Sequence, residues 1–238
     1  MPWIYVKKGN PKLLPAMCGR YTLTPAPGIL EDRFDAAFAA SLPGPTYNAA
    51  PSQSLPVILN TEPGRIQLMR WGLVPGWVKD LKAAPKPINA RAETLTEKPS
   101  FRTLLQRRRA LVLADSFYEW QASTHGKTPY RILLKDQQPF AFAGLWDEWV
   151  DRQTGEVLPT FTIITTEPNE LMAPIHNRMP VILPSREAEL AWLDDGTGLE
   201  EHQHLLQPYP AEAMQAYAIS TLVNSPAHNS PEVMAPAA

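Results

Sequence analysis

The chain has 238 residues and a formal net charge of −2 at pH 7, with 44% hydrophobic and 19% charged residues. This composition is typical of a globular domain and excludes an intrinsically disordered chain. No apolar run approaches the roughly 18 residues that a membrane-spanning helix needs, and the first 16 residues lack the apolar segment of a secretory signal. We therefore expect a cytoplasmic protein without a membrane span.

Runs rich in β-branched and aromatic residues predict strands, and capped periodic segments predict helices. In chain order we predict a helix over 27–40, a strand over 65–74, a helix over 100–108, strands over 109–120, 130–135, 140–150 and 160–166, and helices over 167–174 and 185–195. Turn signals at 125–127, 135–139 and 152–156 predict antiparallel hairpins. The expected fold is α+β: one domain with a curved, mostly antiparallel, barrel-like sheet and peripheral helices.

The charged residues are unevenly distributed. Between Arg65 and Arg109 there are eleven Lys or Arg and only three acidic residues, a local charge of +8 in a chain whose total is −2. A basic segment of this kind is either a solvated surface or a face that meets phosphates.

Cys18 is the only cysteine, so neither an internal disulfide nor a cysteine-based zinc site can form. The glycine-rich signatures of nucleotide-binding loops are missing as well. We therefore expect no cofactor and no metal site.

Four short segments place reactive or polar side chains beside turns and strand ends. They are "MCGRY" with Cys18, "INARAET" with Asn89, "SFYEW" with Glu119 and "IHNRMP" with His176. Taken singly, each residue has an ordinary structural explanation, such as a small buried cysteine or a turn asparagine.

Taken together and in order, these segments resemble one family. The chain is similar to the SRAP (SOS-response-associated peptidase) family over about residues 17–226, with residues 1–16 as a leader and 227–238 as a C-terminal tail. Its further matching segments are "YNAAP" at 47–51, "WGLVPGW" at 71–77, "ITTEPN" at 164–169 and "LVNSP" at 222–226. Two mild departures are Ser116, where many relatives have Gly, and Asn177, where Asp is common.

The resemblance implies an unusual use of the cysteine. In this family the initiator methionine is removed, and the cysteine, now with a free α-amine, condenses with the aldehyde of an abasic site in DNA to close a thiazolidine ring. The α-amino group has a reference pKa of about 8, so it is partly unprotonated at neutral pH. Because both nucleophiles sit on one residue, the second step is intramolecular, where effective molarities reach ~10⁵ M or more.

The resemblance also assigns roles to the other motif residues. Asn89 would hold the amine or the sugar, Glu119 would move protons, and His176 would protonate the deoxyribose ring oxygen. The residues expected to contact DNA are Arg20, Pro51, Trp71, Arg91, Trp120, Thr165 and Arg178. Of these, the three arginines would bind phosphates, and Trp71, Trp120 and Pro51 would stack on or wedge against exposed bases. The expected partner is single-stranded or junction DNA containing abasic sites, and the protein is expected to be monomeric, cytoplasmic and, in a bacterium, associated with the nucleoid.

The leader is the departure that matters most. While residues 1–17 are attached, the nitrogen of Cys18 is an amide and no thiazolidine can form. Either the true start is Met17, or the leader is cut before Cys18 by the protein's own activity, or this chain has lost the crosslinking function.

Three other functions also remain open. A Cys–His peptidase would use Cys18, His176 and Asn89, and would tolerate an internal cysteine. An N-terminal-cysteine glutamine amidotransferase would explain Cys18 but leaves the other motifs without roles. A plain DNA-binding module predicts salt-sensitive binding without a covalent product.

Overall fold

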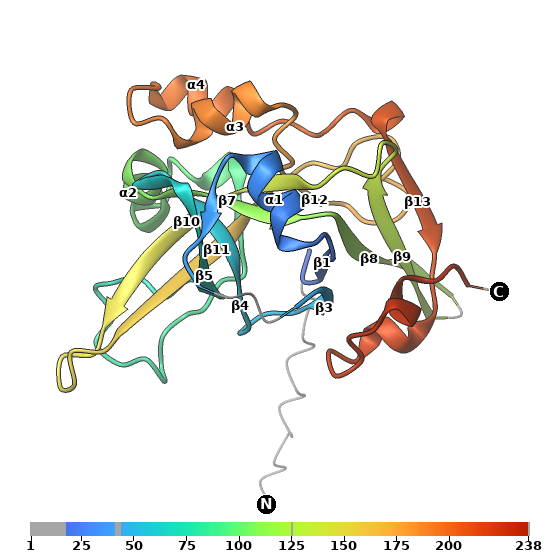
Figure 1. Ribbon diagram of the computed structural model, residues 1–238, viewed down its shortest axis with the longest axis horizontal. Helices are drawn as coiled ribbons and strands as arrows, with labels where there is room; N and C mark the ends of the chain where they lie inside the picture. Colours follow the sequence, from blue (N-terminus) through green and yellow to red (C-terminus); the bar gives the residue numbers. More distant parts are fainter. Residues whose placement is uncertain (1–17, 41–43, 125, 238) are drawn as a thin grey trace, which may run out of the picture.

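Two β-sheets form the centre of the protein, whose computed structural model describes residues 18–40, 44–124 and 126–237 (Figure 1). The larger sheet has the order β12-β11-β10-β7-β4-β5-β2, made of Met179–Pro180, Val157–Thr166, Phe140–Val150, Arg109–Ala114, Ser54–Leu59, Glu62–Trp71 and Ala37–Phe38. The smaller sheet has the order β13-β9-β8-β1-β3, made of Met214–Ala218, Gly126–Leu134, Ser116–Ser123, Tyr21–Leu23 and Thr46–Ala49. A further short strand, β6 (Asn89–Arg91), runs parallel to β11.

The larger sheet closes on itself. Thr160 and Phe161 of β11 pair in parallel with Arg70 and Trp71 of β5, so that β5, β4, β7, β10 and β11 form a closed five-stranded barrel with mixed strand directions. Closure leaves these strands without a free edge. The result confirms the expected α+β, barrel-like single domain.

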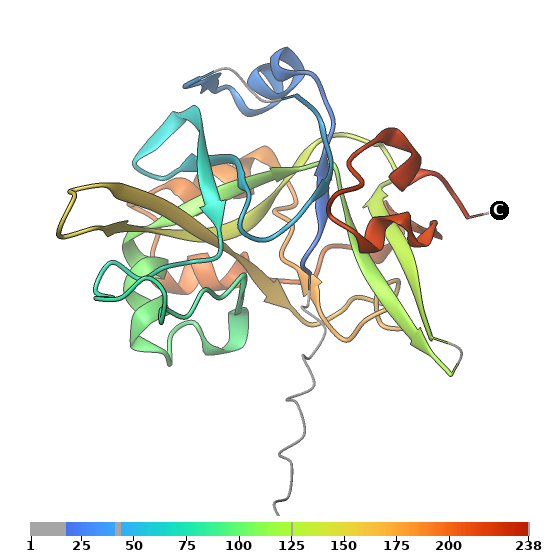
Figure 2. The ribbon, with the colours of Figure 1, turned by 90° about the horizontal axis from the view of Figure 1, so that it is seen from below.

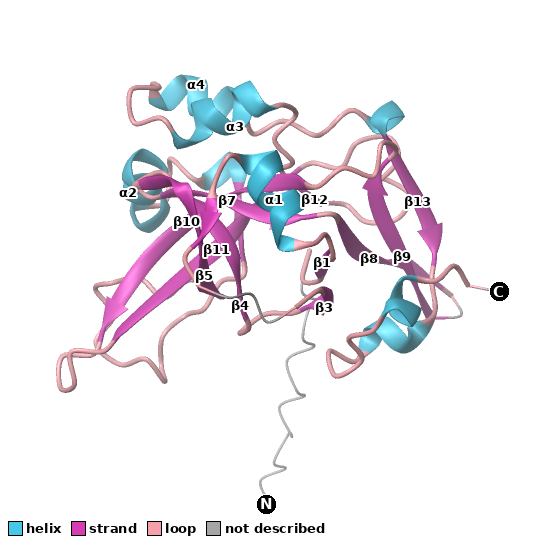
Figure 3. Cartoon of the chain, in the orientation of Figure 1, coloured by secondary structure: helices cyan, strands magenta, loops and turns pink. Residues whose placement is uncertain are grey.

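Short helices lie around the barrel (Figures 2 and 3). The helices are α1 (Pro27–Phe34), α2 (Pro99–Arg107), α3 (Arg186–Leu193) and α4 (Leu199–His204), with 3₁₀ turns at Ala92–Thr94, Ala211–Ala213, Thr221–Asn224 and Pro231–Met234. Leu30, Leu105 and Trp192 of the first three helices cover one face of the barrel strands. The opposite face packs with Tyr21 and Phe117 of the smaller sheet.

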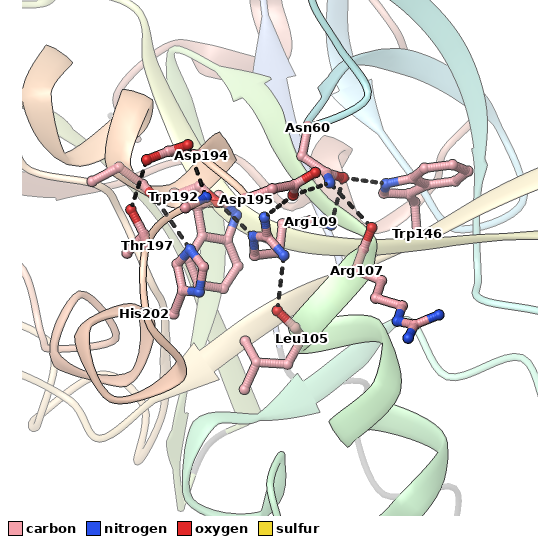
Figure 4. Close-up of polar contacts among 12 residues, drawn as sticks. Asn60, Leu105, Arg107, Arg109, Trp146, Trp192, Asp194, Asp195, Thr197 and His202 are labelled. Atoms are coloured by element: carbon pink, nitrogen blue, oxygen red, sulfur yellow. Dashed lines mark hydrogen bonds and ion pairs between the residues drawn. The ribbon is translucent and has the colours of Figure 1, made fainter.

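A buried arginine ties α3 to the barrel (Figure 4). The side chain of Arg109 on β7 is fully buried; its Nε donates to the carbonyl of Trp192 at 2.8 Å and its Nη1 to the carbonyl of Leu105 at 3.2 Å. Its Nη2 pairs with the carboxylate of Asp195, and Asn60 accepts from the Arg109 main-chain N–H at 2.9 Å. A buried guanidinium is tolerated here because each of its nitrogens has a partner.

Several element predictions are confirmed and others are wrong. The predicted strand over 109–120 is two strands: β7 and β8 belong to different sheets, and the chain passes between them at Asp115. The hairpin predicted at 152–156 is confirmed, since β10 and β11 pair antiparallel on either side of it. The hairpin predicted at 125–127 is confirmed as the antiparallel pair β8 and β9. The expected hairpin at 135–139 is instead a crossover between sheets, because β9 and β10 do not pair.

The helix predictions fare unevenly. Ser185 caps α3 as expected, accepting from the Ala188 main-chain N–H at 3.3 Å. The first helix ends at Phe34, because Asp35 adopts a left-handed conformation with φ of 48°, and the second begins at Pro99 rather than at Ser100. The segment 167–174 forms turns and no helix, and α4 was not predicted.

The C-terminal segment packs on the domain. Residues 219–237 lie beside β9 and β3 (Figures 1 and 2), and Val233 is buried against Tyr118 and Val223. The part expected as a tail, 227–238, is therefore built into the fold up to residue 237, and residue 238 lies outside the described residues. The leader, 1–16, also lies outside them.

Candidate active site and DNA-contact surface

Cys18 and Glu119 meet where the smaller sheet begins. Strand β1 pairs antiparallel with β8, with Tyr21 opposite Phe117, so the residue three positions before Tyr21 reaches the middle of β8. The main-chain nitrogen of Cys18 donates to Glu119 Oε1 at 2.7 Å, and both residues are buried, at 4% and 2% exposure. The register of one strand pair therefore brings together residues that lie 101 positions apart.

His176 completes this group. It lies in the turn before β12 and, with Glu119, Trp120 and Lys127, lines a pocket of about 400 Å³. The Nδ1 atom of His176 lies 3.2 Å from both the main-chain nitrogen and the carbonyl oxygen of Arg178, which holds the imidazole against its own turn. The structure thus gathers Cys18, Glu119 and His176 beside an open pocket.

Burial shifts the pKa values of Glu119 and Cys18. Burial raises the pKa of the Glu119 carboxyl, and the neighbouring His176 and the hydrogen bonds from Cys18 counteract part of that rise. Burial also raises the pKa of the Cys18 thiol, Glu119 raises it further, and Arg178 lowers it. At neutral pH the thiol is therefore protonated, which disfavours chemistry that starts from a thiolate.

Asn89 and Arg91 lie on the neighbouring strand β6. Asn89 is opposite Ile163 and Arg91 is opposite Thr165, at the end of β11 that also pairs with β12. Asn89 and Arg91 line a second pocket, of about 590 Å³, and Arg91 is exposed. The end of β11 therefore connects the second pocket with the turn that carries His176.

Three expected DNA contacts have partners within the protein. Arg178 donates from both Nη atoms to Glu93 and from Nη2 to the carbonyl of Thr165, while the Thr165 side chain is fully buried. Arg20 is half-buried, and its Nη1 donates to Asn48 Oδ1 at 3.0 Å and to the carbonyl of Val223 at 2.8 Å. Each of these three residues therefore has contacts within the protein, and their contact with DNA stays a prediction.

The three expected stacking or wedge residues lie in different environments. Trp71 is 1% exposed, its ring packs against Tyr21 and Phe161, and its indole N–H donates to the carbonyl of Ile88 at 2.9 Å. This burial corrects the expected stacking role of Trp71, because its ring faces are covered by the core. Pro51 and Trp120 are partly exposed.

One surface aromatic was missed from the sequence. Trp77, at the end of the "WGLVPGW" segment, is 67% exposed and lines the second pocket together with Lys86, Arg91 and Lys98. An exposed indole among three cations is suited to stack on a base and to hold the adjacent phosphates. Pro75 and Gly76, directly before Trp77, are typical turn residues and could have indicated that this tryptophan lies at the surface.

Two general findings limit the chemistry of the described residues. Among residues 18–40, 44–124 and 126–237 no group of three or more His, Cys, Asp or Glu could hold a metal ion. None of the helices in that part of the chain is long and apolar enough to cross a membrane.

The chain is similar to known proteins over most of its length. The family model described as SOS response associated peptidase (SRAP) matches residues 17–226. The chain is 49% identical over 223 residues to the abasic site processing protein YoaM of Bacillus subtilis, covering 92% of this chain and 97% of YoaM. It is 36% identical over 224 residues to the abasic site processing protein HMCES of Gallus gallus, covering 81% of this chain and 66% of that protein. A crystal structure of a protein from Bacteroides thetaiotaomicron superposes with a TM-score of 0.85 at 32% identity, covering 93% of this chain and all of that one.

Proposed function

The chain belongs to the SOS response associated peptidase (SRAP) family, and from that premise we propose that it processes abasic sites in DNA by crosslinking to them through Cys18. Its relatives in Bacillus subtilis and Gallus gallus are named abasic site processing proteins. The observation that carries the proposal is the 2.7 Å contact between the Cys18 nitrogen and Glu119 Oε1. It puts a buried proton acceptor on the atom that must attack the aldehyde.

The proposed reaction has two steps, once that nitrogen is a free amine. The amine attacks the aldehyde carbon of the opened abasic sugar, and loss of water gives an imine. The Sγ–H of Cys18 then adds across the imine: a C–S bond forms, and the thiol proton ends on the nitrogen, closing the thiazolidine. Glu119 takes a proton from the attacking amine and returns one to the departing hydroxyl, a general acid–base role.

The protonated thiol supports this order of steps. The raised pKa of Cys18 makes it a poor initial nucleophile, whereas an α-amine with a pKa of about 8 is partly neutral at pH 7. A peptidase that starts from a Cys18 thiolate would need the opposite shift. His176, which lines the same pocket as Glu119, is the acid that we propose opens the sugar ring, and Asn89, in the second pocket, would position the sugar or the amine.

The second pocket is the proposed path of the DNA strand. Trp77 would stack on an unpaired base, while Arg91, Lys86 and Lys98 hold the backbone. Unpaired bases favour single-stranded or junction DNA, and the cations predict binding that weakens with salt. The protein would act as a monomer on DNA, in the cytoplasm or, in a bacterium, at the nucleoid.

Release of the Cys18 amine is part of the proposal. Synthesis from Met17 followed by methionine excision would free it. Hydrolysis of the Met17–Cys18 bond by the protein itself would also free it: water adds to the Met17 carbonyl carbon, the C–N bond breaks, and Glu119, which contacts the Cys18 nitrogen, would give that nitrogen its proton. The raised pKa of Glu119 makes the acid form that this cleavage needs easier to reach, whereas the later attack by the free amine uses the ionised form.

The test is an intact-mass measurement. The full chain and a chain begun at Met17 are each incubated with a single-stranded oligonucleotide containing one abasic site, and with the same oligonucleotide undamaged. We expect a stable adduct only from protein whose mass begins at Cys18, and only with the abasic strand. Cys18→Ala keeps an amine, so it should give an adduct only when borohydride traps the imine.

A protein that begins at Cys18 and forms no adduct would refute the crosslinking proposal. Peptide cleavage by the uncut chain would favour a peptidase, and ammonia release from glutamine an amidotransferase. Salt-sensitive DNA binding without any adduct would indicate that the protein is a plain DNA-binding module.

A further inference from the structure

The loop that carries Trp77 is held on both sides of that residue by strand β10. On one side, the main-chain N–H of Gly76 donates to Asp147 Oδ2 at 2.8 Å. On the other side, the indole N–H of Trp149 donates to the carbonyl of Val78, also at 2.8 Å. Asp147 and Trp149 are each 8% exposed, whereas Trp77 is 67% exposed. Buried partners therefore fix the backbone around a side chain that faces solvent.

The sheet explains why both partners lie under this loop. The pairing of β10 with β7 ends at Leu145, whereas its pairing with β11 continues to Val150. Residues 146–150, paired with 157–161, form a two-stranded ribbon that extends from the barrel (Figure 2). Asp147 and Trp149 are two positions apart on this ribbon, so their side chains point to the same face.

Further contacts hold the same loop and the carboxylate that binds it. The Val74 N–H donates to Thr160 Oγ1 at 2.9 Å, and that hydroxyl donates to the carbonyl of Asp147 at 3.2 Å. Arg108 forms an ion pair with Asp147 Oδ1 at 3.0 Å, which leaves Oδ2 to accept from Gly76. The ribbon therefore fixes the loop at several points along its length.

This rigidity bears on how DNA is bound. Trp77 lines the second pocket with Lys86, Arg91 and Lys98. When only one conformation of a loop can bind, the apparent affinity falls by the fraction of molecules that hold that conformation. A loop that is fixed before the ligand arrives avoids this loss, and the ordering cost of binding is lower as well.

We propose that Trp149 and Asp147 are positioning residues for DNA binding, which hold the backbone on either side of Trp77 so that its indole is presented at the second pocket before the strand arrives. This inference rests on the proposed function, in which Trp77 stacks on an unpaired base. It also gives a function to the part of β10 and β11 that extends beyond the barrel.

The first test measures binding of undamaged single-stranded DNA by fluorescence anisotropy, using the chain begun at Met17. Trp149→Phe removes the indole N–H and keeps an aromatic ring. It should weaken binding by about two- to fivefold, because the loss of one hydrogen bond shifts a loop equilibrium by roughly that factor. Normal DNA affinity of Trp149→Phe would overturn the inference.

Trp146→Phe is the matched control from the same strand. The indole N–H of Trp146 donates to Asn60 Oδ1 at 3.0 Å, so this variant also loses one buried hydrogen bond. We expect urea unfolding to show similar losses of stability for the two phenylalanine variants, and DNA affinity to fall only for Trp149→Phe. An equal loss of affinity in Trp146→Phe would mean that general destabilisation is the cause.

A double-mutant cycle with Trp77 separates positioning from a structural role. In a Trp77→Ala protein no indole remains to be presented, so adding Trp149→Phe should weaken DNA binding no further. Asp147→Ala releases the other side of the loop and should show the same dependence on Trp77. Additive effects in both pairs would overturn the inference. Normal DNA binding by Trp77→Ala would overturn it together with the proposed strand path.

The second test measures crosslinking to abasic DNA by protein that begins at Cys18. Trp149→Phe should raise the half-saturating DNA concentration by the same factor and leave the rate at saturation unchanged, because its contact is with Val78 and not with the Cys18 site. A lower rate at saturation with an unchanged half-saturating concentration would contradict a positioning role in binding. If even the unmodified protein forms no adduct, the crosslinking proposal fails, and the binding of undamaged DNA still decides the role of Trp149.

Discussion

The main-chain nitrogen of Cys18 donates a hydrogen bond of 2.7 Å to Oε1 of Glu119, inside the protein and 101 residues away along the chain. A carboxylate buried at 2% exposure is expensive to keep ionised, yet the proposed chemistry needs it to accept a proton. The pKa of Glu119 is raised because burial disfavours its ionised form. Function and stability are therefore opposed at this residue.

Glu119→Gln should make the protein more stable while abolishing stable adduct formation. A carboxyl whose pKa is raised by folding binds its proton more tightly in the folded state, so the native protein loses stability as pH rises from the ordinary carboxyl range through the raised pKa. Glutamine keeps an acceptor for the Cys18 N–H and cannot ionise. We expect its melting temperature to exceed that of the unmodified protein by a few degrees at pH 7.5 and by less at pH 4.5.

Thermal melts at the two pH values check this prediction, with Glu156→Gln as the control for an exposed carboxylate. A lower melting temperature of Glu119→Gln at pH 7.5 would contradict it, because the ionised carboxylate would then stabilise the fold.

Trp77 and Trp71 should respond to alanine in opposite ways. Trp77 is 67% exposed, so Trp77→Ala should leave unfolding by urea almost unchanged and weaken binding of single-stranded DNA by about 1–3 kcal/mol. Trp71 is 1% exposed in the core, so Trp71→Ala should destabilise the fold by about 3–5 kcal/mol. Urea titrations and fluorescence anisotropy with a labelled oligonucleotide measure the two effects. Normal DNA binding by Trp77→Ala would remove Trp77 from the proposed strand path.

Much of the candidate site could be selected from the sequence, because the motif residues lie beside strand ends and turns. Cys18, Glu119 and His176, chosen from such segments, do come together in the structure. The sequence could not separate Trp71 from Trp77, since both lie in one motif and only the barrel closure at Phe161 shows which of them is covered.

The fold was predictable in class but not in topology. Runs rich in β-branched and aromatic residues marked most long strands, but a continuous run from 109 to 120 gives no sign that the chain changes sheets at Asp115. The parallel pairing of β5 with β11 joins segments about 90 residues apart, and no local pattern encodes it. The partners of Arg178 depend on the same long-range pairing, so the sequence could indicate its charge but not its orientation.

Gly76 should be needed to present Trp77. A Cβ at this position would lie 2.8 Å from the carbonyl oxygen of Glu148, and the Gly76 N–H donates to Asp147 Oδ2 at 2.8 Å. Because a backbone atom cannot move aside cheaply, Gly76→Ala should shift the loop and weaken DNA binding several-fold. Gly64→Ala, where an added Cβ meets nothing within 4 Å, is the control. Equal DNA affinity of the two variants would contradict the prediction.

Arg109 and Asp195 should contribute very differently to the free energy of unfolding, although they form one ion pair. Arg109→Met removes the buried donor and leaves the carbonyls of Trp192 and Leu105 unsatisfied, at a cost of about 3 kcal/mol. The Asp195 side chain is 69% exposed, so Asp195→Asn should cost less than about 1 kcal/mol. Urea unfolding measures both. Equal losses would mean that the charge pair, rather than the buried carbonyl contacts, holds α3 to the barrel.

The C-terminal segment should be required for both stability and the site. Val233 is 1% exposed against Tyr118 and Val223, and Asn229 Oδ1 accepts from the main-chain N–H of Asn48 at 3.0 Å. Val233→Ala should therefore lower the free energy of unfolding by about 2 kcal/mol, and Asn229→Ala by about 1–2 kcal/mol.

The effect should extend to crosslinking, because the same segment supports two site residues. Arg20 donates to the carbonyl of Val223, and the indole N–H of Trp120, next to Glu119, donates to Asn224 Oδ1 at 2.7 Å. A chain ending at residue 226 would keep these two contacts but lose the packing of Val233 beneath them, so its crosslinking rate should fall at temperatures where it is still folded. Glu232→Gln, an exposed change in the same turn, should leave both stability and rate as they are. Full crosslinking by the shortened chain would show that residues 219–226 hold their place unaided.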